Sequence, residues 1–417
     1  MKILVVGKGG REHALVRALA ESPGTHELFC FPGSDAIFQS AQSIVADGLE
    51  SLVAWMKTHA IDLCVAGEES YLVIGDGLAN LCEQNGIPCW GPHKESAQLE
   101  ASKEFAKNFL VRHGIPTARA TATETIVDAV AAIAGEYPTV LKFDGLAAGK
   151  GVAVCPDEAS AMAFLDEVFT ERRFGPGRVL VEQCLVGPEI SIFAAIVDDQ
   201  YLMFTPARDY KRAQDGDHGP NTGGMGAVAS RQLVSKEMLG RIDQEIIQPT
   251  VAGLRAESLP YRGFLYFGLM LTPSGPQVIE YNCRFGDPEC QAVMPLVHGD
   301  LAGFCLAGAQ GMLRPDLLTF DDGWSVCVIL ASAGYPESSR SGDRIRGLDQ
   351  PGNFRVYHAG TRKTPDAGWE THGGRVLAVV AGGATRDEAV VSAHAAADGI
   401  EFDGLQRRRD IGILNFD

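Results

Sequence analysis

The chain has 417 residues, of which 46% are hydrophobic and 21% charged, and its formal net charge at pH 7 is −17. A chain of this length exceeds what one hydrophobic core supports, so several domains are predicted. The acidic balance argues against a nucleic-acid partner, and no apolar run approaches the roughly 20 residues needed to cross a membrane.

Residues 1–101 alternate short apolar runs with helical patterns, which predicts an open, parallel α/β domain. Strands are predicted at Ile3–Val6, Leu28–Phe31, Leu63–Ala66 and Ile87–Trp90, and helices at Arg11–Glu21, Leu49–His59 and Gly77–Asn85. The first turn, Gly7–Glu12, has Glu12 in place of the third glycine of G-x-G-x-x-G, which disfavours a nicotinamide site. Two interpretations remain open: an anion site at the helix N-terminus with Arg11 adding charge, or a tight turn that needs glycine.

The next segment begins with one predicted amphipathic helix, Lys94–His113, which ends at Gly114. A small compact unit follows, with helices near Glu124–Ala134 and Asp157–Phe169 and strands at Thr139–Phe143, Val152–Cys155 and Arg178–Gln183. Its glycine-rich loop at 144–151 is framed by Lys142 and Lys150 but does not match a Walker A loop. The loop can close over the phosphates of a nucleotide, or it can be an ordinary hairpin turn.

Polar residues also gather at the next strand end and in a long loop. Glu182 and Gln183 end a strand, and Glu189 begins a predicted hairpin (Glu189–Val197 and Tyr201–Ala207). The loop from about 208 to 226 is dense in charge and glycine, which is typical of a functional loop, although a disordered insert would have a similar composition. A long helix (Ser235–Glu257), a strand (Gly263–Leu271) and, further on, a helix (Asp300–Gln310) are predicted around the next motif.

That motif is VIEYNCRFGDPE, residues 278–289. In a strand, Ile279, Tyr281 and Cys283 would lie on one face, and Glu280, Asn282 and Arg284 on the other. Carboxylate and amide oxygens suit Mg²⁺, and the guanidinium of Arg284 suits a carboxylate or phosphate. The alternative is a partly exposed sheet face with paired charges.

The remainder, residues 319–417, is predicted to form a separate α+β unit. Its strands are expected at Ser325–Leu330, Arg355–His358 and Val376–Ala381, with a helix near Arg386–Ala397. The triplet Arg407–Arg409 can be a solvated cationic patch or can reach an anionic substrate. The ten cysteines form no C-x-x-C pair and match no zinc pattern, so we expect free thiols in a reducing cytoplasm.

Six motifs in this order resemble those of the phosphoribosylamine–glycine ligase (glycinamide ribonucleotide synthetase) family of the ATP-grasp superfamily. They are GKGGREHAL (7–15), KFDGLAAGKGV (142–152), DYKRAQDGDHGPNTGGMGA (209–227), GFLYFGLML (263–271), RFGDPECQ (284–291) and RRDIG (408–412). The resemblance implies an α/β and α+β multidomain chain: an N-terminal parallel α/β domain (1–101), a two-lobed ATP-grasp region (102–318, small lobe about 121–188) and a C-terminal α+β domain (319–417).

The resemblance also implies an activity and roles for individual residues. The family joins glycine to 5-phosphoribosylamine with ATP in purine biosynthesis, giving glycinamide ribonucleotide, ADP and phosphate through a glycyl phosphate. Mg²⁺ or Mn²⁺ would bind Glu280 and Asn282. ATP would contact Lys103, Lys142, Lys150, Glu182, Gln183, Leu185 and Glu189. Arg284, Asp209 and Lys211 would position glycine, and Gly10, Arg11 and Glu12 would receive phosphoribosylamine.

Other readings of the sequence remain to be weighed. Another ATP-grasp ligase or carboxylase would share the fold but not RFGDPE or the GPNTGGMG loop, and a nicotinamide-dependent oxidoreductase would rest on Gly7–Glu12 alone. Gln183 departs from the acidic residue expected there. The expected partners are small molecules only, with neither nucleic acid nor membrane, and the expected state is a monomer or weak homodimer.

Overall fold

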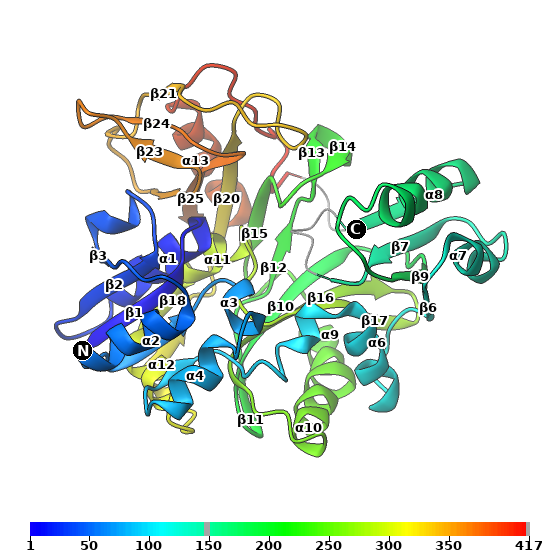
Figure 1. The fold of residues 1–417 in the computed structure, drawn as a ribbon. Coiled ribbons are helices and arrows are strands. Elements are labelled where there is room, and N and C mark those ends of the chain that lie inside the picture. Colours follow the sequence, from blue (N-terminus) through cyan, green and yellow to red (C-terminus); the bar gives the residue numbers. More distant parts are fainter. Residues whose placement is uncertain (146–150, 414–417) are drawn as a thin grey trace.

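The computed structural model describes residues 1–145 and 151–413. Its N-terminal part is a five-stranded parallel sheet in the order β3-β2-β1-β4-β5, as the alternating pattern predicts (Figure 1). The strands are β1 (Lys2–Gly7), β2 (Glu27–Pro32), β3 (Gln42–Ser43), β4 (Leu63–Ala66) and β5 (Cys89–Trp90). The helices are α1 (Gly10–Ala20), α2 (Leu49–Thr58), α3 (Ser70–Val73) and α4 (Leu78–Gln84). β3 and α3 were not predicted because two and four residues are too short to show a period.

The single helix predicted over Lys94–His113 is wrong, because the chain breaks at Ser102. α5 (Gln98–Ala101) and α6 (Lys103–Arg112) flank this residue, whose backbone is extended with φ −126° and ψ 116°. The Ser102 hydroxyl caps α6 by accepting a hydrogen bond from the Phe105 N–H at 3.1 Å, and it donates to Asp144 at 3.1 Å. The break therefore joins the start of α6 to the small lobe.

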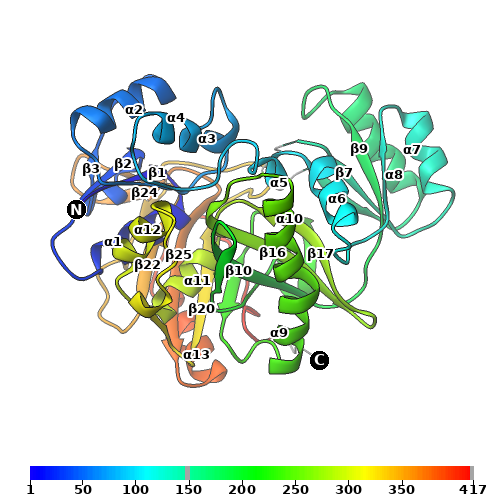
Figure 2. The ribbon, with the colours of Figure 1, turned by 90° about the horizontal axis from the view of Figure 1, so that it is seen from below.

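The small lobe is a four-stranded antiparallel sheet in the order β6-β9-β7-β8. It contains β6 (Ala120–Thr123), β7 (Thr139–Phe143), β8 (Val152–Cys155), β9 (Val179–Gln183), α7 (Ile126–Ile133) and α8 (Glu158–Leu165), which continues as a π-helical turn over Asp166–Thr170. Its apolar core is separate from the others, and the lobe stands at one side of the molecule (Figures 1 and 2).

One large sheet runs through the rest of the chain, in the order β17-β16-β10-β12-β15-β20-β25-β22, with β11 beside β10. Its strands are β10 (Glu189–Val197), β11 (Gln200–Met203), β12 (Ala207–Asp209), β15 (Gly226–Ala229), β16 (Arg262–Thr272), β17 (Gly275–Asn282), β20 (Trp324–Ala331), β22 (Arg355–His358) and β25 (Arg375–Gly383). Because β15 pairs with β20, the C-terminal strands extend the central sheet. The strands of the predicted C-terminal α+β domain thus continue the large sheet, a pairing that has no local signal because about 100 residues separate β15 from β20.

The remaining elements cover this sheet or lie at its rim. The helices are α9 (Lys236–Ile242), α10 (Gln248–Ala256), α11 (Glu289–Val293), α12 (Leu301–Ala309) and α13 (Arg386–Asp398), and a π-helical segment (Asp243–Ile247) joins α9 to α10. Small strand pairs are β13 (Arg212–Gln214) with β14 (His218–Asn221), and β18 (Val297–Gly299) with β19 (Leu318–Phe320). A three-stranded sheet contains β21 (Arg344–Ile345), β24 (Trp369–Thr371) and β23 (Thr361–Lys363).

Two large apolar clusters each contain side chains of both the N-terminal sheet and the large sheet. Ile3 and Val5 of β1 share a cluster with Phe193 of β10, and Leu4 and Val6 share the other with Phe267 of β16. The two sheets are thereby packed into one body, which holds the first turn of the chain against the end of β17. Within the described residues, no helix is both long and apolar enough to cross a membrane.

Candidate active site

The predicted polar face of β17 exists, but its alternation shifts by one residue. Gly268 lies opposite Glu280 while Leu269 lies opposite Val278, so Ile279 is the extra residue of a β-bulge. Val278, and not Ile279, therefore joins Tyr281 and Cys283 in the buried cluster. Glu280, Asn282 and Arg284 share the other face, as predicted.

Glu280 is an ionised carboxylate surrounded by positive charge. Burial alone would raise its pKa, but Lys211, Lys142, Lys103 and Arg284 together lower it below the ordinary value. Its side chain nevertheless forms no hydrogen bond or ion pair with another described residue. A half-buried carboxylate without a contacting partner costs free energy. Four cations near one place favour a ligand that carries negative charge of its own.

Two lysines hold Glu182 at the strand end that was predicted to receive adenine. Lys142 Nζ lies 3.0 Å from Glu182 Oε2, and Lys107 Nζ lies 3.2 Å from Glu182 Oε1. Lys142 also donates to the Ile279 carbonyl at 3.0 Å, which ties the small lobe to β17. The Glu182 carboxylate is thus already paired, while Gln183 is exposed and Leu185 half-buried. Lys107 was not predicted, because it lies on the buried side of α6 among apolar residues.

Lys103 begins α6 and donates to the Gly145 carbonyl at 2.8 Å. Burial lowers its pKa, although Glu280 opposes this effect. Lys103 therefore lies between the small lobe and the carboxylate of β17. The other predicted lysine of this loop, Lys150, lies outside the described residues.

Asp209, the last residue of β12, and Lys211, two residues further on, are both near the Glu280 carboxylate. Lys211 Nζ lies 2.8 Å from Glu189 Oε2, so a residue predicted for glycine contacts one predicted for ribose. Burial raises the pKa of Asp209 to about 7, with Lys211 opposing and Glu289, Glu189 and Glu280 adding to the shift. Asp209 can therefore gain or lose a proton near neutral pH.

A chain of ion pairs connects Arg284 to the first turn. Arg284 Nε lies 3.0 Å from Glu69 Oε2, and Glu69 Oε2 lies 3.4 Å from Arg11 Nη2. Arg11 Nε lies 2.6 Å from Glu12 Oε1, and the other oxygen of Glu12 accepts from the Gly9 N–H at 2.7 Å. The structure thus brings Arg11 and Glu12 beside Arg284, although 273 residues separate Arg11 from Arg284 in sequence.

Two carboxylates that pair with Arg284 were not predicted from the sequence. Glu69 precedes α3, and Glu100 lies within α5, where both look like ordinary surface charges. Glu100 lies 2.6 Å from Arg284 Nη2 and accepts from the Cys283 N–H at 2.6 Å. Burial raises the pKa of Glu100 to about 7 against the pull of Arg284, and the charge of Glu69 adds to the rise.

The tight-turn interpretation of Gly7–Glu12 also holds, because the turn is packed too closely for larger residues. Gly7 has φ +133°, and a Cβ there would lie 2.4 Å from the Glu12 side chain. A Cβ on Gly10 would lie 2.8 Å from Gln291 Nε2, so the start of α1 contacts α11, which begins at the end of RFGDPE. The close packing leaves the backbone of the first turn facing Asp287.

Asp287 and Glu289, for which no role was predicted, contact different parts of the fold. Asp287 Oδ1 lies 3.2 Å from Arg375 of β25 and accepts from Gln291 at 2.7 Å. Glu289 is buried, and its Oε1 accepts from the Ser191 hydroxyl at 3.0 Å. Asp287 therefore connects the first turn to the C-terminal strands, and Glu289 adds negative charge beside Asp209.

The segment 208–226 is ordered as strands and close contacts, not as a disordered insert. Arg375 donates to the Gly223 carbonyl at 2.6 Å, and a Cβ on Gly224 would lie 2.5 Å from Pro288. Arg408, fully buried, pairs with Asp217 and Asp410 at 2.6 Å each. Arg408 is therefore not a solvated cationic residue: it pairs with Asp217 in the turn between β13 and β14, and it donates to the Arg212 carbonyl at 3.2 Å.

The class of protein is ATP-grasp, because an ATP-grasp domain model matches residues 101–290. The structure superposes on the biotin carboxylase domain of the Hydrogenobacter thermophilus 2-oxoglutarate carboxylase with a TM-score of 0.73 and 19% identity, covering 97% of this chain and 91% of that one. This likeness shows the shared fold alone.

The sequence comparisons name the family. Three domain models of the phosphoribosylglycinamide synthetase family match this chain. They are the N domain at residues 1–100, the ATP-grasp (A) domain at 101–290 and the C domain at 325–414. A phosphoribosylamine–glycine ligase of Caldanaerobacter subterraneus is 41% identical over 99% of both chains. The crystal structure of the Thermotoga maritima phosphoribosylamine–glycine ligase has a TM-score of 0.86 and 32% identity, covering 99% of this chain and 100% of that one. The chain belongs to the phosphoribosylamine–glycine ligase family.

Proposed function

We propose that this chain joins glycine to 5-phosphoribosylamine with ATP, producing glycinamide ribonucleotide, ADP and phosphate for purine biosynthesis. The single observation that carries the proposal is the ionised, uncontacted carboxylate of Glu280 beneath Lys103, Lys142, Lys211 and Arg284. Four cations around one carboxylate suit a reaction in which phosphate charge is placed and moved, and the family membership supplies the substrates.

The nucleotide would lie between the small lobe and β17. Lys103 and Lys142 would neutralise its phosphates, with Lys150 from the glycine-rich loop, and the strand end at Glu182, Gln183 and Leu185 would receive adenine. Because two lysines pair with the Glu182 carboxylate, adenine recognition here would use mainly the backbone. Glu189 would accept from the ribose while it remains near Lys211.

A divalent cation fits the donor set on β17. Glu280 is ionised and has no contacting partner among the described side chains, and Asn282 Oδ1, which accepts from Arg284 at 3.0 Å, has a second lone pair available. These oxygen donors suit Mg²⁺ or Mn²⁺. When bound, such a cation neutralises phosphate charge and holds the phosphates in line with the attacking group.

Glycine would be held by its carboxylate against Arg284, with Asp209 and Lys211 beside it. A glycine carboxylate oxygen forms the new bond to the γ-phosphorus as the bond to ADP breaks, giving glycyl phosphate. The amine nitrogen of phosphoribosylamine then attacks the glycyl carbonyl carbon, the bond from that carbon to the phosphate oxygen breaks, phosphate leaves, and the nitrogen gives up one proton. Positioning and positive charge lower the first barrier, and exclusion of water protects the intermediate.

The phosphoribosylamine would bind where the first turn meets RFGDPE. Gly10, Arg11 and Glu12 lie beside Asp287 and Gln291 there, and the Arg11–Glu69–Arg284 chain connects that place to the glycine position. Two substrates that must react with each other would thus be bound by one connected network. We expect the enzyme to be a cytoplasmic monomer or weak homodimer whose partners are these small molecules.

The test is ADP release measured with each substrate omitted in turn. The proposal requires ADP formation that depends on both glycine and phosphoribosylamine, with glycinamide ribonucleotide as the product identified by mass spectrometry. Replacing glycine by bicarbonate tests the carboxylase alternative. Turnover with bicarbonate and without glycine would overturn the proposal.

A further inference from the structure

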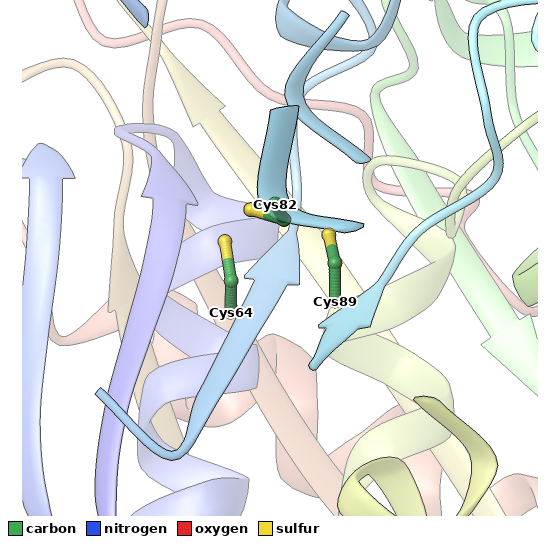
Figure 3. A group of neighbouring side chains, drawn as sticks. All are labelled: Cys64, Cys82 and Cys89. Atoms are coloured by element: carbon green, nitrogen blue, oxygen red, sulfur yellow. The ribbon is translucent and has the colours of Figure 1, made fainter. Parts of the chain in front are cut away.

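Three cysteines that are far apart in the sequence meet in the N-terminal sheet, away from the residues proposed for catalysis. Cys64 lies on β4, Cys82 on α4 and Cys89 on β5 (Figure 3). Their sulfur atoms all lie within 4.8 Å of one another. Cys64 and Cys82 are buried, whereas Cys89 is half-buried. The sequence spacing matches no metal motif, so this cluster exists only in the fold.

Rigid elements hold all three thiols. Cys64 and Cys89 are register partners on adjacent parallel strands, so their side chains leave the same face of the sheet. The Cys64 N–H donates to the Pro88 carbonyl at 2.9 Å, which fixes that register. Cys82 lies on α4, which covers this face of the sheet. In Figure 3 its sulfur lies above the sulfurs of Cys64 and Cys89. The three sulfurs therefore converge without a flexible loop.

We propose that Cys64, Cys82 and Cys89 form a binding site for one thiophilic metal ion. Thiolates select soft ions such as Cu⁺ and Zn²⁺. Metal–sulfur bonds of about 2.3 Å place three ligand sulfurs roughly 4 Å apart in a trigonal arrangement, which the observed limit of 4.8 Å accommodates.

The ligand count favours Cu⁺. Among the residues that the structure describes, no histidine or carboxylate joins the three sulfurs. Zn²⁺ sites are usually four-coordinate, so Zn²⁺ would need a water as its fourth ligand, on the side of the half-buried Cys89. Cu⁺ accepts three thiolates without a further ligand. Each thiol loses its proton on binding, and these protons pass to solvent.

The proposal does not depend on the proposed catalytic function. A bound ion would cross-link β4, β5 and α4, and it would stabilise the folded chain because the unfolded chain does not hold the three thiols together. The competing explanation is that three small side chains simply fill the space between a helix and a sheet, as free cysteines often do. Direct metal binding separates the two.

The experiment titrates the reduced, full-length chain anaerobically with Cu⁺ as its acetonitrile complex, in competition with a chromogenic Cu⁺ chelator. A parallel arm uses Zn²⁺ with a Zn²⁺ chelator. The expected result is about one equivalent of tightly held ion per chain and a higher thermal midpoint on binding. Cu⁺ retention with weak Zn²⁺ retention indicates a three-coordinate site, and retention of both indicates that water completes the Zn²⁺ sphere.

Variants test whether the tightly held ion binds to the three cysteines. Cys82→Ala and, as a milder change at the half-buried position, Cys89→Ser should each lose the tight equivalent and the thermal shift. Cys305→Ala is the matched control, because Cys305 is a buried thiol on α12 outside the cluster, and it should retain both. The proposal is overturned if wild type holds no tight equivalent, or if Cys89→Ser holds as much as Cys305→Ala.

Discussion

Glu280 is the residue on which the proposed chemistry depends most. Its neighbours are four cations that lower its pKa, yet it contacts none of them directly. The arrangement leaves the carboxylate free for an added cation and its phosphates. A salt bridge would have satisfied the charge but removed that capacity, so the separation is consistent with the proposed metal site.

Replacing this carboxylate should stop turnover without unfolding the chain. In Glu280→Gln we expect kcat to fall by about a hundred-fold or more, because metal-ion catalysis contributes several kcal/mol to charge stabilisation. Mn²⁺ binding in the presence of ATP, followed by electron paramagnetic resonance, should weaken in parallel. Glu245→Gln, which breaks a surface pair with Arg241, is the matched control. Unchanged turnover in Glu280→Gln would contradict the metal assignment.

Glu100 should act by positioning Arg284. Its pKa is about 7, so it is charged above pH 7 and protonated below. We therefore expect the KM for glycine to rise as pH falls through 7 in wild type. In Glu100→Gln the KM for glycine should be raised several-fold and should lose this pH dependence, while the KM for ATP is unchanged. A variant that retains the wild-type pH profile would show that another group controls Arg284.

The residues show which parts of the site the sequence could predict. Glu280, Asn282 and Arg284 were predictable because strand alternation places charged groups together within one short segment. Glu69, Glu100 and Lys107 were not predictable, because each contacts its partner across 75 to 215 residues. In the sequence, Glu69 and Glu100 look like ordinary surface charges, and Lys107 stands alone among the apolar residues of its helix. Asp287 and Glu289 belong to a motif that resembles the family's, but their partners Arg375 and Ser191 could be identified only in the structure.

At the scale of elements, the bounds of several strands were predicted correctly, but two interruptions within elements were not predicted. β4, β7, β8, β10 and β22 have the predicted bounds. The break at Ser102 and the bulge at Ile279 were missed, because each depends on a tertiary partner: Asp144 for the first and β16 for the second. Both interruptions lie beside the proposed site, where they turn Lys103 and Glu280 toward it.

The contact between the 208–226 segment and RFGDPE should be sensitive to one methyl group. Gly224 has φ +107°, and a Cβ there would lie 2.5 Å from the Pro288 ring. In Gly224→Ala we expect stability to fall by about 1–3 kcal/mol from backbone strain, and kcat/KM for glycine to fall by about ten-fold or more as Asp209 and Lys211 move.

The control for this change is Gly240→Ala, within α9. No atom lies within 4 Å of the added Cβ at Gly240, and alanine favours the helix. Stability should therefore hold or rise, with activity unchanged. Denaturant unfolding and steady-state kinetics measure both variants. Equal activity in the two would mean that the loop does not position substrate groups.

At the scale of the whole molecule, the N-terminal sheet and the C-terminal strands close around the same segment. α1 packs beside β22, where His13 Nδ1 accepts from the His358 N–H at 3.0 Å. The large sheet continues into the C-terminal strands, and two apolar clusters each contain side chains of the N-terminal sheet and the large sheet. Sequence patterns gave the fold class and most elements, but long-range pairing such as β15 with β20 has no local pattern.

This junction should weaken in acid. Burial lowers the pKa of His13 to about 4 and that of His358 to about 3. Both are neutral when folded, whereas the unfolded chain takes up protons below about pH 6.5, so their contribution to stability is present above that pH and is lost as pH falls toward 4. We expect each histidine to lower the free energy of unfolding by about 2 kcal/mol as the pH falls from 7.5 to 5.

The measurement is urea unfolding at both pH values. His13→Gln should lose about 2 kcal/mol less than wild type over this interval, while His298→Gln, at a half-exposed surface pair, should lose as much as wild type. An unchanged pH dependence in His13→Gln would show that acid destabilises a different part of the molecule.

The most direct test of the account follows an oxygen atom. If glycine is activated by attack of its carboxylate on the γ-phosphate, then one carboxylate oxygen must leave with the released phosphate. We predict that glycine labelled with ¹⁸O in its carboxylate, supplied with ATP and phosphoribosylamine, transfers one ¹⁸O to phosphate per glycinamide ribonucleotide formed, as read by mass spectrometry. Phosphate free of ¹⁸O, with product still formed, would contradict the account.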